Sequence, residues 1–327
     1  MRRWLQRLSP ALHLTRVTMA FAVISNTWFV ILWTRANPEH EGRAVALVDQ
    51  PLWLLLGAAA MVGVGLFAFG VSLNDILDMK RDRLLRPQRP LASGQMSLEQ
   101  AVALLVGTMI VAILGATVFG TRAVLMTLAL QAGILVFNAV GKFIPAIGLV
   151  FLGLIYGGHM LIPNLHLRFL WPVWLVMTHA LVVGAITYRM ARKVPKLSRR
   201  AVVAAVVGWL FWSSVLLYRQ WKHAEGLAIW PDWVDPIAAV WPAALLALFI
   251  VVVWRRTAKL GSGPRAAEKI EKYGALWLSF YACGWLVGTG HAGSAALMLG
   301  LAVASVVGMT VLREAFGLLE QPLGYRR

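Results

Sequence analysis

Residues 72–94 read SLNDILDMKRDRLLRPQRPLASG, and they begin at the end of the apolar run of residues 52–73. The stretch holds Asp75, Asp78 and Asp82, three of the six aspartates in the chain. A run of about 20 apolar residues is long enough to cross the hydrocarbon core of a bilayer as a helix. The chain therefore places half of its aspartate where a membrane helix is expected to end.

The composition is that of an integral membrane protein. Of the 327 residues, 59% are hydrophobic and only 14% are charged, whereas about 25% of the residues of a soluble domain are charged. Ten apolar runs occur, at 17–34, 52–73, 98–118, 122–140, 144–162, 170–189, 201–218, 236–254, 274–289 and 292–312. The sequence therefore predicts an all-α, polytopic transmembrane bundle of nine to ten helices that forms a single domain over residues 1–327.

The distribution of the net charge of +17 predicts how the chain is oriented in the membrane, and we expect no nucleic-acid partner. Most of the 31 lysines and arginines fall in every second loop. If the N-terminus is cytoplasmic, the basic segments 74–97, 189–200 and 255–273 all lie inside, as the positive-inside rule requires. We expect a multi-pass protein of the bacterial inner (cell) membrane, surrounded by lipid, with residues 74–97 facing the cytoplasm.

Tryptophan and cysteine support this interpretation. Six tryptophans fall at the predicted ends of apolar runs, where an amphipathic ring prefers the membrane interface; they are Trp33, Trp53, Trp171, Trp230, Trp233 and Trp254. The single cysteine, Cys283, excludes an internal disulfide and a metal centre built from several cysteines.

The aspartates are spaced like ligands for a hard cation. With Asn74 they form the pattern N-D-x-x-D-x-x-x-D. On a helix with 100° per residue, Asn74 lies at about 0°, Asp78 at about 40°, Asp82 at about 80° and Asp75 at about 100°, so one face holds all four. Crowded carboxylates repel each other unless cations neutralise them. Mg²⁺ suits such oxygen ligands, since it binds one or two carboxylates and takes its other ligands from water and substrate phosphate.

The cations near the aspartates leave two interpretations open. In a solvated loop at the membrane surface, the acids would pair with Lys80, Arg81 and Arg83. Beyond them, however, the segment RPQRP holds Arg86 and Arg89 beside prolines, and guanidinium groups bind phosphate oxygens well. Acids for a metal followed by arginines for phosphate favour a diphosphate site.

The stretch from Asn74 to Gly94 resembles the first signature of the UbiA superfamily of intramembrane prenyltransferases, which is N-D-x-x-D-x-x-x-D followed by R-P-x-R-P and S-G. The segment FNAVGKFIPAIG, residues 137–148, is similar to an aromatic-and-lysine element at the end of the family's fourth helix. There the resemblance implies that Lys142 contacts the diphosphate, while a lysine that merely snorkels to the interface is the alternative. Phe137 stands where the family often has tyrosine, so a hydroxyl contact from that position is lost.

The resemblance implies a UbiA-like fold and a polyprenyl diphosphate substrate whose prenyl group passes to a small acceptor. The acceptor would be an aromatic or quinone precursor or an anionic molecule. The implied catalytic residues are Asn74, Asp75, Asp78 and Asp82, and the implied ligands of Mg²⁺ are the three aspartates among them. Arg86, Arg89 and Lys142 are implied to bind the diphosphate.

The chain departs from the family at the second aspartate-rich motif. The corresponding loop reads TYRMARKVPKLSRR, residues 187–200, and no Asp or Glu occurs between Glu99 and Glu225. The cations of this loop, Arg189, Arg192 and Lys193, are expected to bind the diphosphate in place of a second metal ion. Alternatively they bind an anionic acceptor, catalysis is lost, or the loop is basic only for topology. If catalysis is lost, we expect an isoprenoid-lipid-binding membrane protein.

The number of helices is a second departure, because the family fold has nine and the chain has ten apolar runs. Either the runs 274–289 and 292–312 form one interrupted helix, or the region 201–254 contains an addition. Tyr188 and His159 are further polar candidates for the cavity, although His159 can equally serve helix packing.

Overall fold

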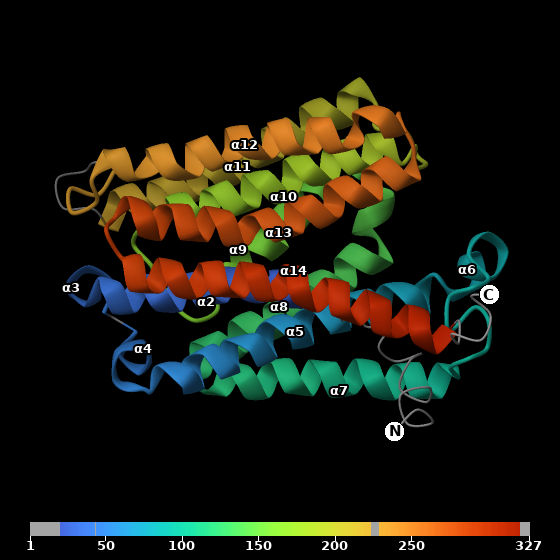
Figure 1. The fold of residues 1–327 in the computed structure, drawn as a ribbon, viewed down its shortest axis with the longest axis horizontal. Helices are drawn as coiled ribbons and strands as arrows, with labels where there is room; N and C mark the ends of the chain where they lie inside the picture. The colour runs from blue at the N-terminus through green and yellow to red at the C-terminus, as the bar shows by residue number, and fades with distance from the viewer. Residues whose placement is uncertain (1–19, 43, 224–228, 321–327) are drawn as a thin grey trace.

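The computed structural model describes residues 20–42, 44–223 and 229–320, and every regular element within these ranges is a helix (Figure 1). Each of the ten apolar runs corresponds to one long helix. These are α2 (Ala20–Ala36), α5 (Leu52–Leu77), α7 (Leu98–Thr117), α8 (Thr121–Ala139), α9 (Pro145–Leu161), α10 (Trp171–Met190), α11 (Arg199–His223), α12 (Val240–Thr257), α13 (Pro264–Gly288) and α14 (Ala292–Glu320). The short elements are α3 (Pro38–Glu41), α4 (Val45–Asp49), α6 (Met79–Leu85) and the 3-10 turns Gly141–Phe143, Pro236–Ala239 and Ala258–Leu260.

The last two apolar runs are two helices and not one interrupted helix. α13 ends at Gly288 and α14 begins at Ala292. Gly290 adopts the left-handed conformation with φ of 80°, which glycine reaches at little cost. The chain reverses there, and α13 and α14 then pack against each other along their lengths. The interpretation of residues 274–312 as a single broken helix is therefore wrong.

The bundle has two halves that α2 and the contact between α8 and α9 join. In one half α5 packs against α7 and α8, and in the other α10 packs against α9 and α13. α2 contacts α5, α9, α13 and α14, while α8 contacts α9, so the two halves form one body (Figure 1). The largest buried apolar cluster joins α2, α9, α10, α13 and α14, and a smaller cluster joins α5, α7 and α8.

Small residues allow the helices to approach closely. A Cβ added to Gly65 on α5 would lie 2.8 Å from the backbone nitrogen of Ala112 on α7. A Cβ added to Gly153 on α9 would lie 2.9 Å from the carbonyl oxygen of Met177 on α10. These glycines serve helix packing, which is how membrane helices commonly associate.

The apolar surface agrees with a membrane location. Six of the described helices, with their end turns, are long and apolar enough to span a bilayer by length and composition. In α11 and α12 only 11% and 17% of the most apolar window is buried inside the bundle, so these helices present their side chains outward. The chain is an integral membrane protein.

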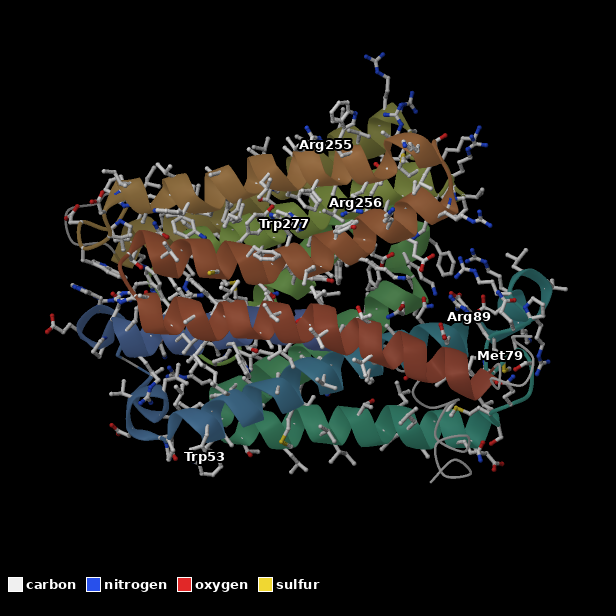
Figure 2. All side chains as sticks on the ribbon, in the orientation of Figure 1. Trp53, Met79, Arg89, Arg255, Arg256 and Trp277 are labelled. Atoms are coloured by element: carbon white, nitrogen blue, oxygen red, sulfur yellow. The ribbon has the colours of Figure 1, made fainter. Side chains whose placement is uncertain are left out.

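The tryptophans at helix ends differ in exposure. Trp53 and Trp254 are 75% and 67% exposed at helix ends, and Figure 2 labels Trp53 at the start of α5. Trp33 is fully buried and stacks on Phe169 with ring centroids 4.9 Å apart. Trp33 therefore packs inside the bundle, where Phe169 covers the end of α2.

The helices run alternately up and down, so alternate connections meet at the same end of the bundle. One end carries residues 78–97, 140–144, 191–198 and 258–263, and we call it the site end (right in Figure 1).

Candidate functional site

The aspartate motif lies where α5 passes into α6 at the site end. α5 ends at Leu77, and Asp78 leaves helical geometry with ψ of 2° before α6 begins at Met79. The chain nevertheless keeps helical spacing, since the amide of Asp78 donates to the carbonyl of Asn74 at 2.9 Å and the amide of Asp82 to that of Asp78 at 2.8 Å. The expected single helical face is therefore interrupted at Asp78, but its four polar side chains stay close together.

Arg89 links two of the aspartates. Its Nη1 atom lies 2.8 Å from Oδ1 of Asp75 and 2.6 Å from Oδ2 of Asp82. Both carboxylates are buried, and the Arg89 side chain is 16% exposed. A single nitrogen thus holds two carboxylates that are seven residues apart in the chain.

The loop after α6 places Arg89 over the acids. Arg89 donates its amide to the carbonyl of Arg86 at 3.1 Å and accepts at its own carbonyl from the amide of Ser93 at 2.8 Å. Leu91 and Met96 are buried against Ile76 and Met79, which fastens the loop to the end of α5 and the start of α6. The apolar anchors, rather than the charges alone, therefore fix the position of the guanidinium group. Figure 2 labels Arg89 and Met79 at this end of the bundle.

Lys142 supplies the second cation, from the turn between α8 and α9. Its Nζ atom lies 2.9 Å from Oδ1 of Asn74 and 2.9 Å from Oδ1 of Asp78. The side chains of Lys142 and Asp78 are each 15% exposed. An ion pair that is mostly withdrawn from water is screened less than a surface pair.

Asn138 helps to position Lys142, and its role was missed from sequence. Its side-chain amide donates to the carbonyl of Ile134 at 3.0 Å within α8 and to that of Gly70 at 3.4 Å on α5. The residue is buried, so this contact ties the end of α8 to α5 one turn above Asn74. An asparagine inside an apolar helix was the available signal, because such a group needs a partner in a membrane.

The structure therefore brings together six of the predicted residues: Asn74, Asp75, Asp78, Asp82, Arg89 and Lys142. The solvated-loop interpretation required pairs with Lys80, Arg81 and Arg83. Among the described contacts the aspartates pair instead with Arg89 and Lys142, and Arg83 lies 4.0 Å from the sulfur of Met79. Arg86 is exposed at the end of α6, next to the cluster in the chain.

The acid-free loop after α10 lies at the same end but is held elsewhere. Arg189, Arg192 and Lys193 are exposed, and Arg192 donates to the hydroxyl of Ser262 at 3.4 Å, in the connection between α12 and α13. Tyr188 donates to the carbonyl of Pro195 at 2.6 Å and so fixes the loop. No contact described for Arg192 reaches the aspartates, and binding of diphosphate by this loop stays a prediction.

The donor set fits a divalent cation in chemistry and in part in geometry. In the part of the chain that the structure describes, no three side chains among His, Cys, Asp and Glu converge as a ready metal site. Asp75 and Asp82, however, both touch the same nitrogen of Arg89. A cation in the place of that nitrogen would contact both carboxylates, which is as many as Mg²⁺ typically uses.

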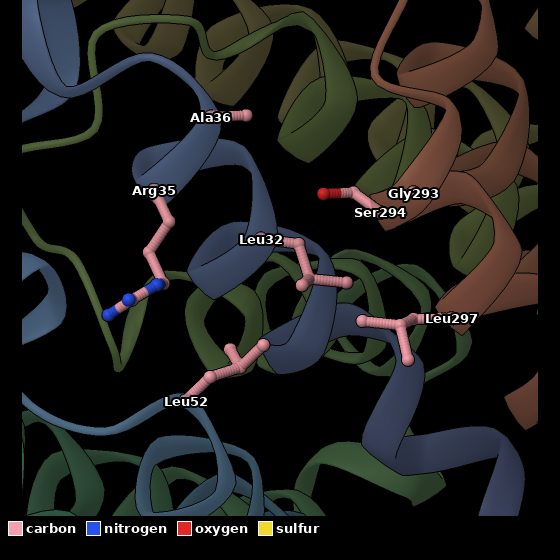
Figure 3. A pocket seen from close by; sticks show the side chains of 7 residues that line it. All are labelled: Leu32, Arg35, Ala36, Leu52, Gly293, Ser294 and Leu297. Carbon is pink, nitrogen blue, oxygen red and sulfur yellow. The ribbon is translucent and has the colours of Figure 1, made fainter.

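The opposite end of the bundle holds a different arrangement. A pocket of about 390 Å³ opens between Leu32, Leu52 and Leu297, next to Arg35 (Figure 3). Arg35 donates to the carbonyls of Leu47, Val48 and Gln50 at 2.7, 3.2 and 2.8 Å, so its charge serves the connection before α5. This pocket is lined mainly by apolar residues and lies at the opposite end of the bundle from the aspartates. The Arg35 side chain already donates to three carbonyls, so we do not assign the diphosphate to this pocket.

Glu41 is a buried acid near that end. It accepts hydrogen bonds from the amides of Arg168 and Phe169 at 2.7 and 2.9 Å and from the indole of Trp33 at 3.3 Å. Burial raises the pKa of Glu41 above 4.5, although these donors oppose the shift. Its role is structural, because it fastens the segment before α10 to the end of α2.

The fold and the site together define a class, which is a polytopic helical membrane protein with an acidic and cationic cluster at one end. No family model and no curated protein matches the sequence. Among solved structures, the chain is similar to digeranylgeranylglyceryl phosphate synthase in membranes, with 16% identity, a TM-score of 0.50, and coverage of 86% of this chain and 98% of that one.

Two further solved structures are similar at lower TM-scores. A UbiA homologue from Aeropyrum pernix K1 has 17% identity, a TM-score of 0.49 and coverage of 83% of this chain and 98% of its own. A UbiA homologue from Archaeoglobus fulgidus, bound to GPP and Mg²⁺, has 14% identity, a TM-score of 0.42 and coverage of 91% and 99%. The likeness at a TM-score of 0.50 shows that the chain shares its fold with digeranylgeranylglyceryl phosphate synthase, and the all-helical architecture expected from the sequence is confirmed.

Proposed function

We propose that this chain is a UbiA-like intramembrane prenyltransferase, which moves a polyprenyl group from its diphosphate to a small acceptor. The observation that carries the proposal is the cluster of Asn74, Asp75, Asp78 and Asp82 held together by Arg89 and Lys142. Two cations from different parts of the chain meet the acids at one end of an apolar bundle. The combination suits a charged diphosphate head and an apolar tail.

The reaction breaks the bond between C1 of the prenyl chain and the bridging oxygen, and the diphosphate leaves with the electron pair. The allylic cation that remains forms a bond to the acceptor, which then loses a proton to solvent. Arg89 and Lys142, with Arg86 nearby, would stabilise the charge that develops on the departing diphosphate. The apolar helices around the tail would keep water from the cation.

Mg²⁺ is the cofactor in this proposal, with Asp75, Asp78 and Asp82 as its ligands and Asn74 beside them. When bound, it would supply Lewis-acid assistance to diphosphate departure. The support comes from the oxygen donors themselves and from the two carboxylates that already share one cation.

Arg189, Arg192 and Lys193 enter the proposal as exposed cations that attract anionic substrates to the site end. Exposed charges act over a distance and are screened by salt, so they change the rate of association more than they hold a ligand. An anionic acceptor would benefit in the same way. The same basic connections support an orientation with the site facing the cytoplasm of a bacterial inner membrane.

A second candidate function has one observation in its favour. The loop at 187–200 has no acid, and Arg192 is held at Ser262. A chain with only one acidic half-site could bind an isoprenoid diphosphate without turning it over. This alternative is a non-catalytic isoprenoid-lipid-binding protein.

Diphosphate release separates the two functions. The purified chain is incubated with Mg²⁺ and labelled geranylgeranyl diphosphate, and release is followed across a panel of aromatic, quinone-precursor and phosphorylated acceptors. We expect release that EDTA and Asp78→Ala both abolish. Asp49→Ala is the matched control, because Asp49 is an exposed aspartate at the end of α4, before α5 begins and at the opposite end of the bundle from the site end. Binding without release for every acceptor would favour the lipid-binding protein.

A further inference from the structure

We infer that Arg89 and Lys142 act as place-holding cations: they occupy the carboxylate oxygens, and the metal and the diphosphate must bind together to displace them. The inference rests on the proposed function and adds an order of binding to it. Mg²⁺ alone is then a weak ligand, whereas Mg²⁺ with a diphosphate is a strong one.

The contacts show which oxygens are engaged. Arg89 takes Oδ1 of Asp75 and Oδ2 of Asp82, and Lys142 takes Oδ1 of Asp78 together with Oδ1 of Asn74. Each aspartate of the motif therefore has at least one oxygen bound to a resident cation. The two pairs also hold the acids in separate groups, which agrees with the finding that no three acids converge among the described residues.

Burial makes these contacts costly to break one at a time. Asp75 and Asp82 are buried, and Arg89, Lys142 and Asp78 are 15% or 16% exposed. If a metal ion displaced Arg89 alone, a mostly buried guanidinium group would lose its counter-charge, which is strongly unfavourable. A diphosphate removes that cost, because its oxygens accept the guanidinium and ammonium groups as the carboxylates release them.

The consequence is mutual: metal raises the affinity for diphosphate by the same factor by which diphosphate raises the affinity for metal. Neutral replacements of the two cations separate this coupling into parts. Arg89→Gln frees two carboxylates and removes a competing charge, so the affinity for metal alone rises while the gain from diphosphate falls. Lys142→Gln does the same at Asp78.

The test measures free Mn²⁺ by electron paramagnetic resonance in the presence of the purified full chain, with and without inorganic pyrophosphate. For the wild type we expect weak binding of Mn²⁺ alone and binding at least about tenfold tighter with pyrophosphate. For Arg89→Gln and Lys142→Gln we expect Mn²⁺ alone to bind about tenfold tighter than in the wild type, which is about 1.4 kcal/mol. Arg83→Gln, on the exposed side of α6, should match the wild type.

Two results would overturn the inference. One is binding of Mn²⁺ alone that is as tight in the wild type as in both glutamine variants, and the other is a loss of Mn²⁺ affinity in those variants. Arg89→Lys guards against misfolding, because it keeps the charge and should bind Mn²⁺ alone as weakly as the wild type. The proposed function fails separately, if pyrophosphate does not bind at all, and in that case tighter Mn²⁺ binding by Arg89→Gln would still support the place-holding role.

Discussion

Gly65 on α5 offers the sharpest test of how the bundle supports the site. Its added Cβ would lie 2.8 Å from the amide nitrogen of Ala112, 2.8 Å from the carbonyl of Thr108 and 2.9 Å from the Ala112 methyl group. Ordinary contact begins at 3.4 Å, so Gly65→Ala forces α5 and α7 apart by roughly 0.6 Å. The obstacle is backbone, which cannot rotate away, and overpacking of this kind costs about 1–3 kcal/mol.

The same helix contains its own control. A Cβ added to Gly57 has no atom within 4 Å, and replacing a helical glycine by alanine gains about 0.5–1 kcal/mol. Subtracting that gain leaves Gly65→Ala destabilised by up to about 2.5 kcal/mol, while Gly57→Ala is neutral or stabilised. Thermal unfolding in detergent, followed through the 15 tryptophans, should rank Gly65→Ala below the wild type and Gly57→Ala at or above it. If Gly65→Ala melts as high as Gly57→Ala, the close approach of α5 and α7 is not as described.

Three further predictions concern charge and the basic loop. Burial raises the pKa of Glu41 above 4.5, so the stabilisation that protonated Glu41 gives the fold is complete below pH 4.5 and is lost as pH rises through the folded-state pKa. Across that range the melting temperature of the wild type should fall relative to that of Glu41→Gln. A constant difference between the two melting temperatures would contradict the burial argument. Arg192→Gln should weaken pyrophosphate binding by about threefold or less at low salt and should have no effect at about 0.5 M salt, where charges are screened beyond about 4 Å. The effect of Arg89→Gln on pyrophosphate binding should persist at high salt. An effect of Arg192→Gln that does not depend on salt would mean that Arg192 contacts the ligand directly. Tyr188→Phe should speed hydrogen exchange of residues 191–198 without changing Mn²⁺ binding, and unchanged exchange would show that the hydroxyl does not hold the loop.

The sequence predicted the helices well, because each one is an apolar run that needs no partner to be recognised. The boundary between α13 and α14 was harder, since Gly290 and His291 interrupt a nearly continuous apolar stretch and only the packing of the two helices shows that the chain reverses. The burial of Trp33 likewise depends on how distant segments pack. A tryptophan at the end of an apolar run suits an interface and a core equally well, and Phe169, far away in the chain, decides the matter.

The site was predicted in composition but not in pairing. On the helical wheel Asn74 and Asp78 are neighbours at about 0° and 40°, and Asp82 and Asp75 are neighbours at about 80° and 100°. In the structure Lys142 contacts the first pair and Arg89 the second, and the side-chain amide of Asn74 donates to Asp75 at 3.3 Å and so links the two pairs. The wheel could give the pairs, but the cation on each depends on how α8 packs on α5 and how the loop after α6 folds back.

The division of charge bears on the missing acidic loop. Three carboxylates share two cations, so the cluster is nearly neutral before any ligand binds, and a diphosphate ester adds several negative charges. In a site with two acidic motifs, those charges would be met by metal ions held on both sides. Here residues 187–200 supply no acid to hold a second metal ion, but Arg89 and Lys142 would turn from the carboxylates to the phosphate oxygens as one metal ion takes the acids. The cations that pair with the acids before a ligand binds are then the same ones that replace the charge of a second ion, so this exchange would make an acid-free loop compatible with catalysis. Tight binding of Mn²⁺ alone by the wild type would count against the exchange, whereas turnover is tested separately by the release of diphosphate.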